Sequence, residues 1–197
     1  MIKFGTDGWR AEIARDFTFE NLRYVALATA KYIVQLANEK RKNKVPTGAA
    51  RERQVQPSCV LGYDTRFLSK EFAYETACVL ASQGVIVHLS DKVASTPQVS
   101  FNTKAKTANL GVVITASHNP PSYNGFKLKS ALGGPASPEQ VDIVEKELEK
   151  IIKKPFPKID SFDKYVNEKK IRFFDTKESY IRMINKKINI GKILEQN

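Results

Sequence analysis

The segment 115–127, TASHNPPSYNGFK, concentrates more side chains that could do chemistry than any other stretch of the chain. It contains Ser117, His118 and Lys127, and it follows an apolar run, 110–114, that is typical of a buried strand. In open α/β sheets, ligands bind at loops that follow the carboxyl ends of the strands. Ser117 is therefore the candidate for the reacting atom.

A serine in such a loop could simply cap a turn. The neighbouring threonine, asparagine and prolines already supply the residues that turns favour, so capping is the weaker interpretation of Ser117. A hydroxyl group is a poor nucleophile unless a base or a charge assists it. His118 is adjacent in sequence, and a hairpin could fold Lys127 back toward the serine, so both are candidates for that assistance.

Two further segments could support an anion site. In FGTDGWR, residues 4–10, two glycines let backbone N–H groups approach an anion, and the guanidinium of Arg10 can hold a phosphate through two hydrogen bonds. A β-turn with a surface arginine explains this segment equally well. In GYDTR, residues 62–66, we favour a loop that enters a helix with Arg66 paired to Asp64, and a supporting role at the site is the alternative.

Short apolar runs alternate with segments of helical periodicity. The expected strands cover 58–63, 85–89 and 109–114, and the expected helices cover 18–38, 69–83, 96–103 and 138–152. Thr18 and Ser69 are the predicted N-caps of the first two helices, and the alternation and Asn124-Gly125 within 123–130 indicate an arm of an edge hairpin. We therefore predict a three-layer α/β/α domain with a mostly parallel mixed sheet and an antiparallel edge strand. After residue 153 the pattern weakens to a mixed stretch over 160–175 and a weak helix over 177–186.

The formal net charge of +11 favours anionic partners. A basic insert is expected at 39–57, whereas the lysines after residue 146 alternate with glutamates, as on a solvated helix face. Because no basic stripe with interleaved aromatic residues and no zinc-binding spacing occurs, no nucleic-acid partner is expected. No apolar run is long enough to span a membrane, the first residues do not resemble a signal peptide, and Cys59 and Cys78 are expected to be buried thiols. A cytoplasmic protein without a membrane partner fits these features.

Taken together, these segments resemble the α-D-phosphohexomutases. The run 114–120, ITASHNP, with 124–127, NGFK, is similar to the active-site loop of that family. FGTDGWR and GYDTR match the family in order and spacing, and GGPASPE, residues 133–139, resembles the phosphoglucomutase/phosphomannomutase branch. The resemblance covers about the first 150 residues well and the remainder loosely.

The resemblance implies that Ser117 is carried as a phosphoserine. It would exchange its phosphoryl group with a hexose 1- or 6-phosphate through a hexose 1,6-bisphosphate, with Mg²⁺ bound to a phosphoserine oxygen. Lys127 matches a lysine proposed as general base, His118 a histidine beside the transferring phosphate, and Arg10 an arginine that stabilises phosphoryl charge. Thr6, Arg10, Asn119 and Lys127 are the implied phosphate-binding residues.

One departure from the family is large. Family members have four domains, and the aspartates that bind the metal lie in a DGD-type loop of the second domain, whereas this chain contains no DGD. We therefore expect residues 1–153 to be the first domain, and residues 154–197 to be a linker and the start of the second. The remaining domains of the same polypeptide would then be partners, and the chain alone would be inactive. A phosphoglucosamine mutase domain and a non-catalytic phosphosugar- or polyanion-binding module are the alternatives.

Overall fold

The computed structural model describes residues 2–5, 8–42, 56–188 and 192–193 of the 197-residue chain. Most of the predicted basic insert, 43–55, and Thr6 lie outside the described residues. The strands are β1 (Trp9–Glu12), β2 (Ser58–Tyr63), β3 (Ile86–Ser90), β4 (Leu110–Ile114), β5 (Tyr123–Ser130) and β6 (Ile171–Phe174). The helices are α1 (Phe19–Lys42), α2 (Ser69–Ser82), α3 (Thr96–Ala105), α4 (Pro138–Ile151), α5 (Phe162–Asn167) and α6 (Thr176–Lys187).

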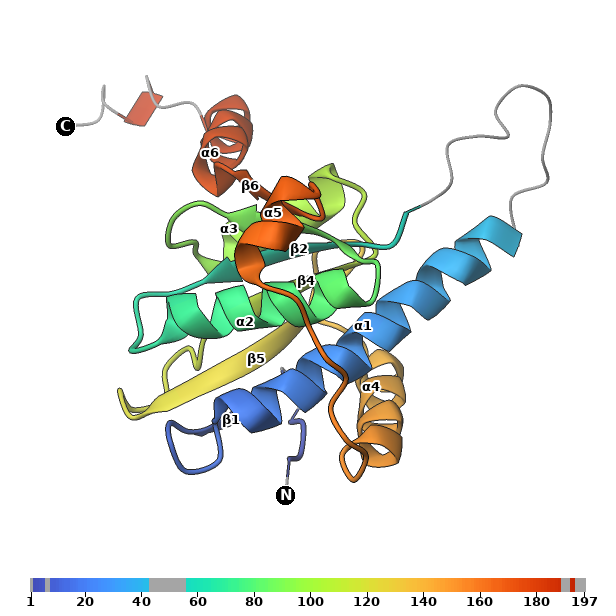
Figure 1. The fold of residues 1–197 in the computed structure, drawn as a ribbon. Coiled ribbons are helices and arrows are strands. Elements are labelled where there is room, and N and C mark those ends of the chain that lie inside the picture. Colours follow the sequence, from blue (N-terminus) through green and yellow to red (C-terminus); the bar gives the residue numbers. More distant parts are fainter. Residues whose placement is uncertain (1, 6–7, 43–55, 189–191, 194–197) are drawn as a thin grey trace.

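The six strands form one mixed sheet in the order β1-β5-β4-β2-β3-β6 (Figure 1). Strands β4, β2, β3 and β6 pair in parallel, and β5 pairs antiparallel with both β4 and β1. The predicted mostly parallel sheet is confirmed, and its antiparallel edge consists of β5 together with the outer strand β1.

Helices cover both faces of the sheet (Figure 1). On one face α2 packs over β2, β3 and β4, α1 packs on α2, and α4 packs on α1. The larger hydrophobic core lies here and is built around fully buried side chains such as Phe17, Phe72 and Phe126. A smaller cluster of Val60, Val99 and Val113 lies under α3 on the opposite face, where α6 packs against α3. The predicted three-layer α/β/α arrangement is confirmed.

Local capping explains where several helices begin. Thr18 accepts a hydrogen bond from the backbone N–H of Asn21, as predicted. Ser95 and Ser137 each form a capping box with a glutamine three residues later, and a proline lies within the first two residues of each helix. Ser69 does not cap α2, contrary to the prediction: it is the first helical residue, and its hydroxyl donates to Asp64 instead.

Three features of the sheet differ from the sequence-based prediction. Residues 123–130 form one continuous strand that pairs antiparallel with β4, as a hairpin arm would, but β5 is not at the edge because β1 pairs on its other side. Strand β1 was not predicted and begins directly after the segment in which Gly5 and Gly8 are hydrogen-bonded to each other. Strand β6 lies within the stretch that was mixed in pattern and pairs with β3, so residues beyond 153 take part in the same sheet.

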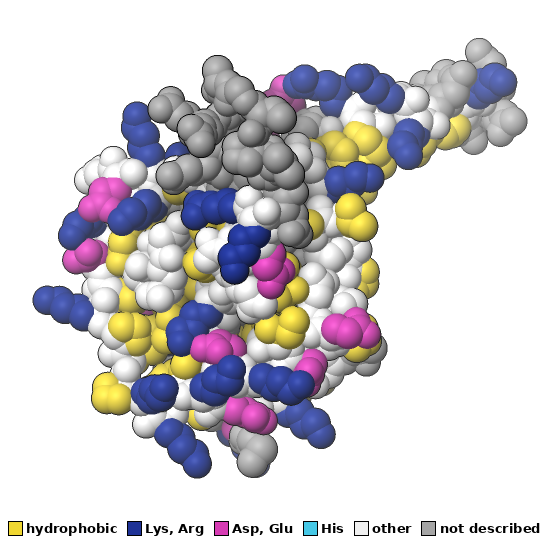
Figure 2. Space-filling view, turned by 90° about the vertical axis from the view of Figure 1, so that its right-hand side faces the viewer, with side chains coloured by type: hydrophobic (Ala, Val, Ile, Leu, Met, Phe, Trp, Pro, Cys, Tyr) yellow, Lys and Arg dark blue, Asp and Glu magenta, His cyan; other side chains and the backbone are white. Residues whose placement is uncertain are grey.

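Many of the positive charges lie beside acidic side chains. On α4 and α1, lysines pair with acidic residues: Lys146 with Asp142 at 2.7 Å, and Lys31 and Lys150 with Glu147 at 2.7 and 3.3 Å. Figure 2 shows one face on which most basic side chains stand among acidic, polar and apolar ones. Among the described residues, no helix combines the length and the hydrophobicity that a membrane crossing needs.

Candidate functional site

The loop that carries Ser117 lies at the carboxyl end of β4 and leads directly into the antiparallel strand β5. Because β2 and β4 are parallel neighbours, the loop that follows β2 reaches the same edge of the sheet. In open α/β sheets, ligands bind outside the carboxyl ends of the strands.

Ser117 occupies a tight turn in an unusual backbone conformation. The N–H of Asn119 donates to the carbonyl of Ala116 at 3.1 Å, which closes a turn with Ser117 as its first central residue. The φ of Ser117 is 57°, in the left-handed region that is costly for residues with a side chain. Its N–H donates to the hydroxyl of Thr115 at 3.0 Å, and its side chain is exposed. The candidate nucleophile thus stands in solvent on a strained and hydrogen-bonded turn.

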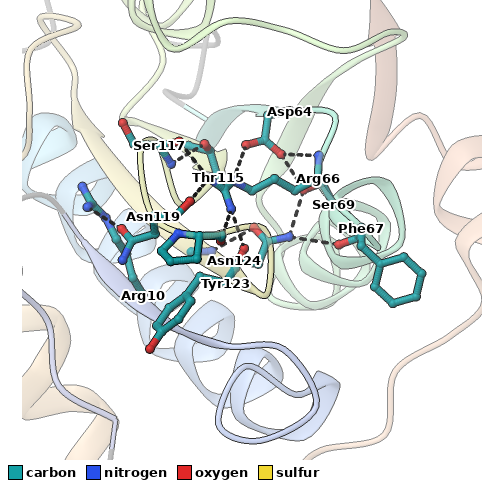
Figure 3. Close-up of polar contacts among 12 residues, drawn as sticks. Arg10, Asp64, Arg66, Phe67, Ser69, Thr115, Ser117, Asn119, Tyr123 and Asn124 are labelled. Carbon is teal, nitrogen blue, oxygen red and sulfur yellow. Dashed lines mark hydrogen bonds and ion pairs between the residues drawn. The ribbon is translucent and has the colours of Figure 1, made fainter.

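Arg66, in the loop after β2, binds the backbone of the serine loop (Figure 3). Its Nη2 donates to the carbonyls of Ser117 at 2.8 Å and Asn119 at 2.6 Å. Its Nη1 donates to the carbonyls of Pro120 at 2.8 Å and Tyr123 at 2.9 Å. The arginine side chain is only 14% exposed. One guanidinium therefore connects the loops after β2 and β4 through four backbone carbonyls.

Asp64 and Asn124 hold the loop from which Arg66 extends. One carboxylate oxygen of Asp64 accepts from the N–H of Arg66 at 2.9 Å and the hydroxyl of Ser69 at 2.7 Å, and the other lies 3.4 Å from Nε of Arg66. The predicted Arg66–Asp64 pair is therefore present. The amide of buried Asn124 donates to Ser69 Oγ at 2.9 Å and to the carbonyl of Phe67 at 3.3 Å (Figure 3).

Arg10 reaches the serine loop from the opposite side. It lies on β1 directly across from Gly125 of β5, and its Nη1 donates to Oδ1 of Asn119 at 2.9 Å. A Cβ on Gly125 would lie 2.5 Å from the carbonyl oxygen of Thr115 and 3.1 Å from Cγ of Arg10. The absence of a side chain at this position thus lets Arg10 and the start of the serine loop pack on β5.

Lys127 lies on β5 opposite Val113, and only 5% of it is exposed. Since side chains alternate along a strand, Lys127 lies on the face of the sheet opposite to Phe126, which belongs to the larger core. Gly8 packs so closely on this strand that a Cβ there would lie 2.8 Å from Cα of Lys127. Gly8 is thereby adjacent to Lys127, whereas Thr6 lies outside the described residues. His118 is exposed next to Ser117.

The structure thus brings several predicted residues to one edge of the sheet. Arg10 and Asn119 are hydrogen-bonded, and Ser117 and His118 lie in the same turn. Arg66 and Asn124 were not predicted to hold this loop. The sequence signal for them was the position of GYDTR after a core strand, but the sequence does not state that β2 and β4 are neighbours.

The described residues offer no complete metal site. They contain no group of three or more histidine, cysteine, aspartate or glutamate side chains placed to hold a metal ion. A phosphate on Ser117 would supply oxygen ligands, but the carboxylates that Mg²⁺ usually takes from proteins are not gathered beside it. The described side chains therefore do not fit a magnesium site by themselves. Their chemistry, an exposed hydroxyl on a loop that Arg10 contacts through Asn119, suits the covalent transfer of an anionic group.

Comparison with known proteins agrees with the motifs. Residues 1–155 match the family model described as "Phosphoglucomutase/phosphomannomutase, alpha/beta/alpha domain I". A phosphoglucomutase of Staphylococcus saprophyticus is 33% identical over 186 residues, which cover 91% of this chain and 30% of that protein. A phosphoglucomutase of Staphylococcus aureus is 34% identical over 156 residues, covering 76% and 25% of the two chains.

Solved structures of phosphomannomutases and phosphoglucomutases superpose on this chain. A Thermus thermophilus protein assigned as a phosphomannomutase superposes with a TM-score of 0.76 at 29% identity, over 96% of this chain and 37% of the other. Parafusin, a phosphoglucomutase of Paramecium, superposes with a TM-score of 0.72 at 18% identity and covers 97% of this chain, which shows a shared fold. This chain spans between 25% and 37% of the length of these relatives.

Proposed function

The chain belongs to the phosphoglucomutase/phosphomannomutase family, and from that membership we propose that it is the serine-bearing domain of an enzyme that interconverts hexose 1-phosphate and hexose 6-phosphate. The observation that supports this most strongly is the presentation of Ser117. Its hydroxyl is exposed, while both of its peptide groups are held by Thr115 and Arg66 at the carboxyl edge of the sheet. A serine that only capped a turn would not need a strained conformation fixed from both sides.

In the proposed reaction, Ser117 carries the phosphoryl group as a phosphoserine. A hydroxyl of the hexose phosphate attacks the phosphorus atom, a new bond forms between phosphorus and the sugar oxygen, and the bond to the Ser117 oxygen breaks. Lys127 takes the proton of the attacking hydroxyl, and the released Ser117 oxygen takes up a proton; both proton transfers run in the opposite direction when the serine is rephosphorylated. The resulting hexose 1,6-bisphosphate reorients, and the reverse step returns its other phosphoryl group to Ser117, so that atoms and charge balance over one cycle.

The other side chains are proposed to hold phosphoryl charge. Catalysis of phosphoryl transfer depends mainly on positioning and on electrostatic stabilisation of the equatorial oxygens. Arg10 donates a hydrogen bond to Asn119 of the serine loop, and His118 is exposed beside the serine. We assign Arg10 and His118 to the transferring phosphate, and Thr6, Arg10, Asn119 and Lys127 to phosphate binding.

Magnesium is proposed as the cofactor of the complete enzyme. It would neutralise charge on the transferring phosphoryl group as a Lewis acid. Because the described residues do not form a metal site, Ser117 is proposed to contribute only a phosphate oxygen. Aspartate ligands are expected in another domain.

The remaining domains of the same polypeptide are proposed to complete the site. The relatives are about three times longer than the matched region, so they have further parts that could bind the sugar and the second phosphate. The first domain is proposed to end near residue 153, where the family match also ends, although β6 beyond this point joins its sheet. The chain alone is expected to lack measurable mutase turnover because it lacks these elements. The preferred sugar, including the glucosamine phosphate alternative, would be selected by a domain outside this chain.

A coupled assay that converts glucose 1-phosphate to glucose 6-phosphate tests the proposal. The full-length protein should turn over, the Ser117→Ala variant should lose activity, and residues 1–197 alone should be inactive. Normal turnover by the full-length Ser117→Ala variant would exclude the serine as phosphoryl carrier. If the full-length protein is inactive and instead binds polyanions with an affinity that falls steeply with salt, the non-catalytic binding module is the better interpretation.

A further inference from the structure

Arg66 is notable because every N–H of its guanidinium already has a partner within the protein. A guanidinium has five N–H donors. Two on Nη1 and two on Nη2 go to four backbone carbonyls, and Nε faces the carboxylate of Asp64 at 3.4 Å. No Nη donor remains to bind a substrate phosphate, and Nε is paired with a carboxylate. Although Arg66 lies beside the proposed phosphoserine, its role must therefore differ from that of an arginine that contacts the substrate.

The carbonyls that Arg66 binds are those that fix the serine turn. It binds the carbonyl of Ser117 itself and that of Asn119, the residue that closes the turn onto Ala116. The two other carbonyls, of Pro120 and Tyr123, lie where the loop joins β5. A left-handed serine persists only when its surroundings hold it there. Arg66 holds the carbonyl group of Ser117, and the hydroxyl of Thr115 holds its N–H group, so both peptide groups of the serine are fixed.

We propose that Arg66 is a positioning residue that holds Ser117 in its left-handed conformation and thereby sets the direction of the phosphoryl-carrying oxygen. It acts through the backbone of the loop and touches neither substrate nor transferred group. The expected effect of Arg66 on phosphoryl transfer rests on the proposed function, whereas its effect on the conformation of Ser117 does not. The planar guanidinium matters, because a lysine at this position would present a single ammonium group that cannot reach both ends of the loop.

The conformational part is tested by hydrogen exchange on residues 1–197. We expect the amides of Ser117 and Asn119 to exchange about tenfold faster or more in Arg66→Ala, as follows from losing hydrogen bonds to a charged group. Arg66→Lys should lie between Arg66→Ala and the wild type. Free guanidinium at low concentration should slow exchange in Arg66→Ala by reoccupying the vacated position. Arg23→Ala removes an exposed arginine that pairs with Glu75 between α1 and α2, so it is the matched control and should leave both amides unchanged.

The catalytic part is tested in the full-length protein. We expect Arg66→Lys to lower kcat on the order of 100-fold, the scale of loss that misplacement of a reacting group causes, with little change in KM. A KM increase with unchanged kcat would contradict a positioning role, because it would indicate that Arg66 binds substrate. Unchanged exchange of the Ser117 and Asn119 amides in Arg66→Ala would overturn the proposal directly. If the wild type shows no phosphoryl transfer, the proposed function fails, and the exchange data still decide whether Arg66 holds Ser117.

Discussion

The left-handed conformation of Ser117 predicts that glycine is better tolerated at this position than alanine. Both substitutions remove the hydroxyl, so they separate the conformational cost of the turn from its chemistry. At a φ of 57°, alanine keeps the steric conflict of a Cβ in the left-handed region, whereas glycine does not. Glycine also gains freedom in the unfolded chain, which offsets part of the benefit. We expect Ser117→Gly to exceed Ser117→Ala in unfolding free energy by about 1 kcal/mol.

The difference is measured by urea unfolding of residues 1–197, monitored by circular dichroism. It should also appear as a difference of about 2–4 °C in Tm, the usual effect of 1 kcal/mol in a chain of this size. Ser122 is the matched control, because it is exposed in the same loop and does not have a positive φ. Glycine should give no advantage over alanine there. Equal stabilities of the two Ser117 variants, or a more stable alanine variant, would refute the claim that the turn is strained.

Three further predictions follow from the packing and the titrating groups. Gly125→Ala should lower the unfolding free energy by about 1–3 kcal/mol, because its Cβ would lie 2.5 Å from the carbonyl oxygen of Thr115. In the control Gly134→Ala, where the nearest atom would be 3.8 Å away, urea unfolding should change little. Burial and the nearby cations of Lys106 and Arg172 lower the pKa of His88 to about 4, so the unfolded chain binds this proton first as the pH falls. The unfolding free energy should therefore decline as the pH drops from about 6.5 toward 4, and it should decline less steeply in His88→Gln. Urea unfolding midpoints at several pH values measure both slopes. Equal slopes in the two proteins would contradict the prediction. Burial raises the pKa of the Cys59 thiol and that of the Cys78 thiol, the latter to about 12, so a thiol reagent should label either residue only after unfolding. Rapid labelling of the native chain would contradict that burial.

The parallel part of the fold was predictable because its signals are local. Buried strands such as β2 and β4 are apolar runs, and the helices between them show clear periodicity and, at Ser95 and Ser137, complete capping boxes. Strand β1 is only four residues long, and β6 leaves Arg172 and Phe173 exposed, so neither has the pattern of a buried strand.

Non-local pairing accounts for the errors and omissions. Asn124-Gly125 favours a turn in isolation, yet both residues lie within β5 because strands pair with it on both sides. Ser117 and Lys127 stood out from their types and spacing, but the role of Arg66 did not. Its four carbonyl partners belong to another loop, between 51 and 57 residues further along the chain, and only the pairing of β2 with β4 brings them together.

The most direct test of the account is to locate the phosphoryl group. The full-length protein is incubated with hexose 1,6-bisphosphate and Mg²⁺, digested, and mapped by mass spectrometry. We expect a single phosphate on the peptide that contains Ser117, and we expect it to disappear when hexose phosphate is added in excess. A phosphate on another residue, or an unmodified Ser117 in a protein that turns over, would contradict the claim that Ser117 carries the transferred group.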